Sequence, residues 1–427
     1  MDMKGKRNSV SAGLLVLIIL ALSFPVLCQA GEVMYPTFSY NDQELAKVRE
    51  WEKTWVGKKV TTATIDQVKD FLSEAVYKAM KDPKNFGADS LWFEVVPYQP
   101  YTVTKGMIEA TKKYAPDSKI INQDVLDKFG DVAGIPFPQP KTGTEMAWNM
   151  DSNTRGDVHT CKNEGEVVDC RTRLERHAGH LRWDTFWMGR TDVAPIPKIP
   201  DERNNRGIFH SFFQRHIAPV DFVDTTMLEI RYKDFSREED LWVYTAMFRR
   251  IRRYATSQRT DTIDGTDMIY DDHDGWYTSP TRNTYKAIGR ADLLVSRHED
   301  QKSLQRASGQ GFWNGVKRER VNNWVVEVVS KDKDYIYSKQ IWYLDPETWQ
   351  MNFKIMYNRQ GELWKTYEMF YDEYPTVQGQ KAAYMSAEHT IDFIRHHGSP
   401  SQYTNHVIGG TVPLEQYQTS ALKEKSY

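Results

Sequence analysis

The residues best suited to chemistry are Asp271, Asp272, His273 and Asp274, which directly precede Gly275. Clustered carboxylates on a turn can hold a hard cation, and a bound metal can activate water for hydrolysis. The spacing lacks the alternating ligands and the distal glutamate of a calcium loop. We therefore predict a polar turn between strands without a metal. A metal-dependent hydrolase that uses these four residues is the alternative.

Two pairs of histidines are weaker candidates for a metal site. His177 and His180 lie three residues apart, so on a strand they face opposite sides and can share a metal only from a helix or a turn. His396 and His397 are adjacent, and neighbours on regular structure seldom bind the same ion. Both pairs are expected to be surface or hydrogen-bonded histidines.

The common catalytic signatures are missing from the sequence. It contains no GxSxG nucleophile elbow, no HExxH zinc motif, no GxxxxGK(S/T) phosphate loop and no paired CxxC. Gly309, Gly311 and Gly315 do not have the spacing of a dinucleotide-binding loop. The sequence therefore predicts neither an enzyme nor a cofactor.

Four arginines, Arg249, Arg250, Arg252 and Arg253, stand shortly before the acidic turn. On a strand, alternate side chains point to opposite sides, so the four cannot share one face. The formal net charge is only −2, which gives no electrostatic reason to expect a nucleic-acid partner. We predict an edge strand kept soluble by its charge. Contact with an anionic headgroup or an acidic partner is the alternative.

The N-terminus has the features of a secretory signal peptide over residues 1–30. Lys4, Lys6 and Arg7 precede an apolar run, and small residues close it. A lipid anchor on Cys28 is less favoured, because the bulky Leu27 stands where a lipoprotein signal has a small residue. The sequence thus predicts export to the periplasm.

Beyond residue 30 the chain has two cysteines, Cys161 and Cys170. Asn163-Glu164-Gly165 between them resembles a hairpin turn, which would bring the two sulfurs together. In an oxidising compartment this arrangement predicts a disulfide.

These residues must be positioned by two different kinds of segment. Residues 31–129 are predicted to be mainly helical, because 64–82 carry an apolar face at helical spacing and end before Pro83. Residues 130–395 have the pattern of antiparallel strands, clearest where an apolar run meets the turn signal Asp345-Pro346. Residues 396–427 lose this periodicity and are predicted to form a C-terminal tail.

Two stretches resemble a known family. Residues 249–272, RRIRRYATSQRTDTIDGTDMIYDD, resemble the segment of outer-membrane lipoprotein-sorting-like proteins in which an arginine-rich strand leads to a Gly-Thr-Asp motif, here Gly265, Thr266 and Asp267. Residues 341–365 resemble their paired strands around an Asp-Pro turn. Two further stretches resemble a larger branch of this family, exported proteins without an assigned function. They are GIPFPQPKTGTEMAWNM and LWVY.

The resemblance implies an α+β fold of the LolA/LolB type. In that fold a large antiparallel sheet curves into an incomplete barrel with helices on its concave face, here preceded by an N-terminal helical extension. The family carries acyl chains or other hydrophobic molecules without catalysing a reaction. Its larger members are linked to transporters of the RND type. The length of this chain and its helical residues 31–129 depart from the small carriers.

We therefore expect a monomeric, non-catalytic periplasmic carrier or chaperone for a lipid or other hydrophobic molecule. Its partner would be an RND-type transporter or an outer-membrane component. A structural adaptor that docks a transporter through its arginines is an alternative. The sequence is equally compatible with an open cavity and with a core filled by aromatic rings. The rings predicted to line a cavity are Trp148, Phe186, Trp187, Phe212, Phe213, Trp276, Trp324, Trp342 and Phe353.

Overall fold

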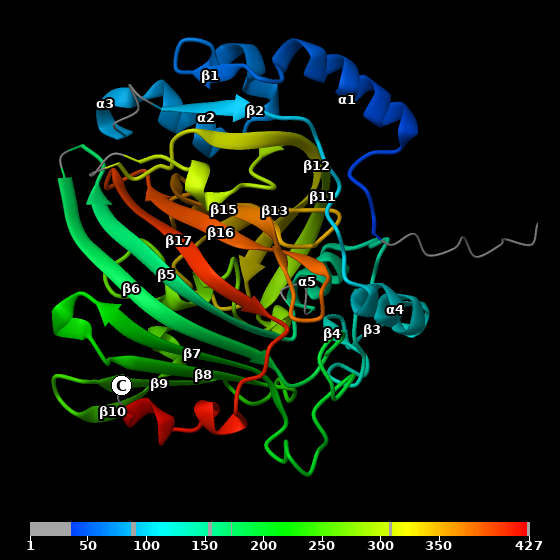
Figure 1. Cartoon of the computed structure of the whole chain (residues 1–427), viewed down its shortest axis with the longest axis vertical. Helices are drawn as coiled ribbons and strands as arrows, with labels where there is room; N and C mark the ends of the chain where they lie inside the picture. Colours follow the sequence, from blue (N-terminus) through cyan, green and yellow to red (C-terminus); the bar gives the residue numbers. More distant parts are fainter. Residues whose placement is uncertain (1–35, 87–90, 153–155, 172, 307–309, 425–427) are drawn as a thin grey trace, which may run out of the picture. The chain divides into compact units, whose positions relative to one another are not determined.

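A single large curved sheet dominates the computed structural model, which describes residues 36–86, 91–152, 156–171, 173–306 and 310–424 (Figure 1). The sheet has 15 strands, and their order is β1-β2-β12-β13-β14-β15-β16-β17-β5-β6-β7-β8-β9-β10, with β11 paired to β12. Neighbours are antiparallel except β2 and β12. Among the described strands no pairing joins β10 to β11 or to β1, so the sheet stays open. The predicted fold class is confirmed.

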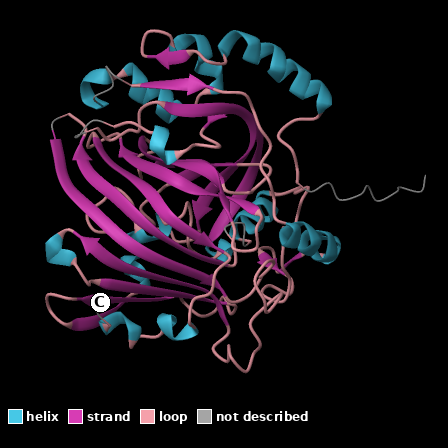
Figure 2. Cartoon of the chain, viewed as in Figure 1, coloured by secondary structure: helices cyan, strands magenta, loops and turns pink. Residues whose placement is uncertain are grey.

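The long strands lie between residues 158 and 408, and Figure 2 shows how strongly they outweigh the helices. The strands are β1 (Lys59–Thr61), β2 (Trp92–Val95), β3 (Ile120–Ile121), β4 (Val125–Leu126), β5 (Val158–Asp169), β6 (Arg173–Phe186), β7 (Ile208–Ala218), β8 (Thr226–Tyr232), β9 (Asp240–Thr245), β10 (Arg250–Tyr254), β11 (Asn283–Val295), β12 (Val316–Ser330), β13 (Lys339–Leu344), β14 (Met351–Tyr357), β15 (Leu363–Pro375), β16 (Lys381–Asp392) and β17 (His397–Ile408). The α-helices are α1 (Asp42–Trp55), α2 (Glu74–Lys81), α3 (Pro83–Phe86), α4 (Lys105–Tyr114) and α5 (Gly143–Asp151).

The central strands are buried on both faces, unlike an antiparallel sheet with one wet side. On one face Phe353, Phe370 and Ile391 pack with the N-terminal helices. On the other face Met356 and Met369 pack with α5 and with the connection from β10 to β11, residues 255–282. Figure 1 shows α5 within the curve of the sheet. We call this second side the inner face.

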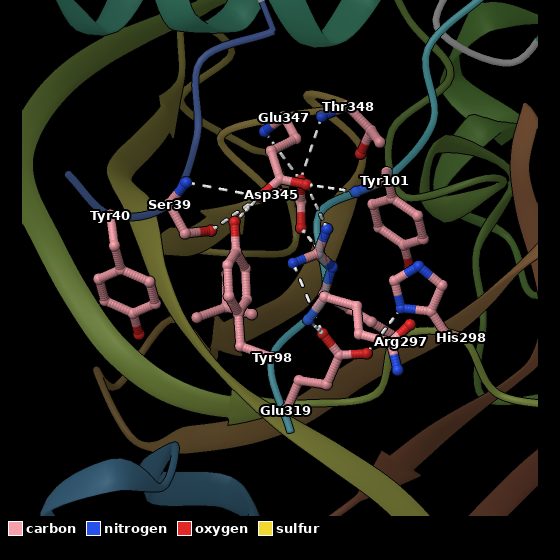
Figure 3. Close-up of polar contacts among 12 residues, drawn as sticks. Ser39, Tyr40, Tyr98, Tyr101, Arg297, His298, Glu319, Asp345, Glu347 and Thr348 are labelled. Carbon is pink, nitrogen blue, oxygen red and sulfur yellow. Dashed lines mark hydrogen bonds and ion pairs between the residues drawn. The ribbon is translucent and has the colours of Figure 1, made fainter. Parts of the chain in front are cut away.

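The N-terminal segment is tied to the sheet by a buried polar network around Arg297, drawn in Figure 3. The Arg297 guanidinium is fully buried and lies 2.5 Å from Oε2 of Glu347 and 3.3 Å from Oδ2 of Asp345. Glu347 in turn accepts hydrogen bonds from the Tyr98 hydroxyl and, at 2.7 Å, from the backbone amide of Tyr101. One carboxylate therefore joins the N-terminal chain to the turn between β13 and β14.

That turn starts at Asp345-Pro346, as the sequence predicts. Asp345 Oδ1 accepts hydrogen bonds from the backbone amides of Glu347, at 2.9 Å, and Thr348, at 3.1 Å. An aspartate that caps two following amides fixes a tight reversal without glycine. The motif thus shapes the hairpin and also presents Glu347 to Arg297.

The expected boundaries at both ends differ from the structure. Residues 31–129 contain helices, but β1 and β2 add to the sheet, and Tyr35–Tyr427 forms one compact unit. The expectation of a tail from residue 396 is wrong, because β17 lies between β16 and β5 inside the sheet. Its sequence HGSPSQYTNHVI carries a proline and few apolar residues, so the sequence pattern does not predict a strand there. The predicted signal peptide, residues 1–30 with Cys28, lies outside the described residues.

None of the helices in the described part of the chain is long and apolar enough to cross a membrane.

Candidate functional site

The acidic turn lies on the inner face of the sheet, and each of its carboxylates faces a different cation. Asp271 accepts a hydrogen bond from Arg259 Nε at 2.6 Å, and Asp272 accepts one from Lys354 Nζ at 2.6 Å. Asp274 lies 3.0 Å from Nη2 of Arg182 on β6. The pairs with Lys354 and Arg182 therefore anchor the turn to β14 and β6, and Arg259, which belongs to the same connection, pairs in turn with Glu229 of β8. The four clustered residues do not converge on a common point as metal ligands must.

Burial governs the electrostatics of this turn. It raises the pKa of Asp271 despite the charge of Arg259. It lowers the pKa of Lys354, even though Asp272 favours the charged ammonium. Buried pairs of this kind are costly to break, because the remaining partner is left charged and without water. The geometry supports an anchoring role for the turn.

The Gly265-Thr266-Asp267 motif continues this anchoring. Gly265 has a φ of 73°, in the left-handed region that glycine adopts without strain. Asp267 accepts hydrogen bonds from Nδ1 of His397 at 2.7 Å and from the Ser399 hydroxyl at 2.8 Å. The motif thus fastens the connection to β17.

The aromatic rings predicted to line a single cavity are distributed over five packing clusters. Phe353 belongs to the cluster under the N-terminal helices, whereas Trp276, Trp324 and Trp342 belong to the inner face around α5. The remaining rings fall into three clusters over β6 to β9: Trp187 and Phe213, Trp148 and Phe186, and Phe212. All nine are buried except Trp324, which is half-buried. Most of these rings fill the core.

One cavity of ligand size lies at the end of β11 and β12, beside the acidic turn. Its volume is about 520 Å³, and Trp276, Arg259, Ser330 and Tyr335 are among its lining residues. Two of these have buried donors without a hydrogen-bond acceptor, namely Trp276 Nε1 and Arg259 Nη2. Both donor atoms are fully buried, so neither faces the open volume of the cavity.

The four arginines lie at the hairpin between β9 and β10, and β10 is an edge strand, as predicted. Arg249, Arg250 and Arg252 are exposed. Arg253 is also largely exposed but pairs with Asp240 across the hairpin. The predicted contact of these arginines with a headgroup or a partner stays a prediction.

The predicted disulfide is wrong, because Cys161 and Cys170 are free and buried. The residues taken for a turn lie inside β5, so the two cysteines are separated by about 30 Å of extended chain. A disulfide needs Cα atoms within about 7 Å. Cys161 packs on the inner face and Cys170 under the N-terminal helices. Burial raises the pKa of both thiols, that of Cys170 to about 12.

Within the described ranges, one group of metal-ligand side chains converges: His180, His216 and Asp264. Spacing along the sequence pairs His180 only with His177, which is exposed on the same strand. The partner of His180 is instead His216, directly opposite it on β7. The register between β6 and β7 brings His180 and His216 together, and spacing along a single strand does not reveal this register.

Comparisons with known proteins give the following matches. A family model described as a protein of unknown function, DUF1329, matches residues 59–423. An uncharacterized protein of Pseudomonas aeruginosa is 23% identical over 333 residues, which are 74% of this chain and 69% of that protein. The family match agrees with the branch without assigned function that the motifs indicated.

Three solved structures are also similar in fold. A domain from Vibrio parahaemolyticus, described as an outer membrane lipoprotein-sorting protein, has a TM-score of 0.47 at 14% identity and covers 66% of this chain and 98% of its own. A DUF1329 family protein from Desulfovibrio piger has a TM-score of 0.47 at 13% identity, with coverages of 66% and 97%. A LolA superfamily protein from Nitrosomonas europaea has a TM-score of 0.42 at 10% identity, with coverages of 66% and 100%.

Proposed function

The chain belongs to the DUF1329 family of proteins of unknown function, and from this premise we propose that it is a non-catalytic periplasmic carrier of an amphipathic molecule. The ligand would be a lipid or similar hydrophobe with an oxygen-bearing head. Its binding site would be the 520 Å³ cavity beside Trp276.

The observation that carries this proposal is the volume of that cavity together with the cations in its wall. Arg259, Arg282 and Lys331 are among its lining residues. A carboxylate or phosphate head would pair with such a cation, and an oxygen paired with a guanidinium forms a strong hydrogen bond. The volume lies within the range of about 300–1,000 Å³ that is usual for small-molecule sites.

The cavity also offers rings to the apolar part of the ligand. Trp276 and Tyr335 lie with their ring centroids 6.3 Å apart at its wall. Rings with one polar edge can contact the apolar body of a ligand with their faces and its polar head with that edge. Other cavities are smaller, about 310 Å³ beside Trp187 and Tyr417, 50 Å³ beside Met107 and 30 Å³ beside Trp148. The cavity near Trp276 has the largest volume of these, which supports it as the site.

A second surface fits delivery of the ligand at an anionic membrane. Met247 and Phe248 at the tip of the β9–β10 hairpin are 67% and 66% exposed. Val220 in the neighbouring β7–β8 connection is 87% exposed. The tips are adjacent because β8 pairs with β9, and Ala246 N donates to Thr225 Oγ1 at 3.4 Å. The apolar side chains suit the acyl region of an anionic membrane, and the neighbouring Arg249 and Arg250 suit its headgroups.

Organic extraction and mass spectrometry of the native protein test the carrier proposal. We expect a co-purifying lipid or, after delipidation, one-to-one binding of a fluorescent fatty acid. Ser330→Trp should abolish binding by filling the cavity, whereas Thr284→Trp, on the exposed side of neighbouring β11, should not. Absence of both lipid and probe binding from the wild type would overturn the proposal, as would equal binding by the two variants.

Vesicle sedimentation tests the membrane surface. We expect binding to phosphatidylglycerol vesicles but not to phosphatidylcholine vesicles. The double variant Met247→Ser, Phe248→Ser should lose this binding. The control Val377→Ser, a 64% exposed valine in the β15–β16 connection, should keep it. Equal binding of both variants would exclude the hairpin tip. A link to an RND-type transporter stays a prediction.

A further inference from the structure

Three side chains from separate parts of the chain meet on the inner face, away from the proposed lipid cavity. His180 lies on β6, His216 lies directly opposite it on β7, and Asp264 belongs to the connection between β10 and β11. Nε2 of His216 is 2.8 Å from Oδ2 of Asp264, and Nε2 of His180 is 3.5 Å from the same oxygen. The three ligand-type atoms all lie within 4.8 Å of one another.

The other nitrogen of each imidazole is already engaged. Nδ1 of His216 lies 2.9 Å from the backbone carbonyl of Thr225, and Nδ1 of His180 lies 3.2 Å from Oδ1 of Asn163. Each Nδ1 therefore donates its proton to an oxygen, which turns each Nε2 toward Asp264. Metal-binding histidines are oriented in this way, with the distal N–H held by a carbonyl or an amide.

A second observation points to a missing ligand. His180 is 92% buried, and its Nε2 makes no hydrogen bond. Nε2 of His216 is hydrogen-bonded to Oδ2 of Asp264, so an ion would replace the proton between these two atoms and would also engage Nε2 of His180. One bound ion would satisfy all three groups.

The surroundings leave room for an ion and a further ligand. His180 and Asp264 border a cavity of about 60 Å³, and about 10–15 Å³ measured in this way holds one water molecule. Arg182 lines the same cavity, but its charge is compensated by Asp274 at 3.0 Å. Asp264 itself is part-exposed, with 21% of its side-chain area accessible, so an ion can enter from its side.

We propose that His180, His216 and Asp264 bind one Zn²⁺ ion, with a fourth position open to water or to a ligand oxygen. Two neutral imidazoles and one carboxylate are the usual three protein ligands of such a tetrahedral site. The ion clamps the β10–β11 connection to β6 and β7. Mg²⁺ and Ca²⁺ do not replace it, because these ions select oxygen ligands.

The test uses the chain that begins after residue 30, without a histidine tag, stripped with EDTA and dialysed. Elemental analysis after reloading and isothermal titration with Zn²⁺ should give one ion per chain. Zn²⁺ should raise the melting temperature, and Mg²⁺ should not. His180→Gln and Asp264→Asn should each weaken binding about tenfold or more. His177→Gln, an exposed histidine on the same strand, is the matched control and should bind like the wild type.

Co²⁺ substitution keeps the proposal testable if the variants fail to fold. The wild type loaded with Co²⁺ should show the intense visible absorption of a tetrahedral nitrogen–oxygen site, and Zn²⁺ should displace it. A wild type that retains no Zn²⁺ after dialysis would overturn the proposal. Full-strength binding by folded His180→Gln or Asp264→Asn would also overturn it. A lipid-binding result does not affect either outcome.

Discussion

At the scale of single residues, the inner face of the sheet carries buried charges. Lys354 lies between apolar positions of β14 and is fully buried, yet it pairs with Asp272. The alternation of the strand correctly indicated one apolar face. It could not indicate that the opposite face is also covered, because the covering segment is distant in sequence. The roles of Lys354 and Arg297 depend on partners that no local pattern specifies.

We predict that Arg297→Ala lowers the free energy of unfolding by about 3–5 kcal/mol, because Asp345 and Glu347 would be left buried without their cation. Urea denaturation followed by tryptophan fluorescence measures the loss. Lys53→Ala is the control, since the Lys53–Glu50 pair is about 70% exposed and should contribute little. A loss of stability no larger than that of the control would contradict the structural role of Arg297.

Glu299 makes the stability of the protein depend on pH. Burial raises the pKa of its carboxyl group to about 7, although a hydrogen bond from Ser303 opposes this shift. Between pH 4.5 and 7 the folded state keeps a proton that the unfolded state has released. The free energy of unfolding therefore falls as pH rises through this window. Glu299→Gln removes this loss. From pH 4 to pH 8, the free energy of unfolding of the variant should therefore rise relative to that of the wild type by on the order of 2–3 kcal/mol.

Urea denaturation of both proteins at pH 4 and pH 8 measures that gain. The exposed Glu50→Gln should show the same difference from wild type at both pH values. If Glu299→Gln also behaves in this way, Glu299 does not carry the pH dependence.

At the scale of elements, the sequence predicted one turn correctly and another wrongly. Asp345-Pro346 begins the turn between β13 and β14, since turn chemistry is local. Asn163-Glu164-Gly165 has the same chemistry but lies within β5, where pairing to β6 and β17 on both sides keeps the chain extended. Tertiary pairing overrides a local turn preference when two neighbouring strands hold the segment.

Truncation tests the place of β17. A chain that stops after Asp392 lacks β17 and leaves β16 and β5 with unpaired edges. We expect it to be insoluble or to lack a cooperative unfolding transition, because an exposed central edge pairs with other chains. A chain that stops after Glu424 should fold like the full protein. Far-UV circular dichroism with thermal unfolding distinguishes the two, and equal transitions would show that β17 is dispensable.

At the scale of the whole molecule, family motifs predicted the fold class. They did not predict that the N-terminal segment packs on the sheet. Val48, Val68 and Phe86 from the N-terminal segment share a core with Phe353 and Phe370 of the sheet. Helical periodicity at the N-terminus predicted an apolar face but not which surface it covers. The sequence could not divide the candidate rings between core and cavity for the same reason, since ring type does not distinguish a core from a cavity.

A fragment of residues 130–427 tests this shared core. Without residues 36–129 it would expose the apolar side of β14 and β15, including Phe353 and Phe370. We expect this fragment to aggregate or to bind a hydrophobic dye strongly, in contrast to residues 36–427. Size-exclusion chromatography and dye fluorescence compare the two. A monomeric fragment with little dye binding would indicate that the N-terminal segment is an independent addition.

The position of β17 has a consequence for how the protein reaches its folded state. Gln402 pairs with Glu164, so the pairing between β17 and β5 joins residues more than half of the chain apart. Pairings across such long loops form slowly, because a large loop must close before the contact contributes. Until β17 arrives, both of its neighbours present open edges to other unfolded chains. The middle of the sheet is thus completed last, after synthesis of nearly the entire chain, and the unfinished sheet depends on protection from aggregation during that interval.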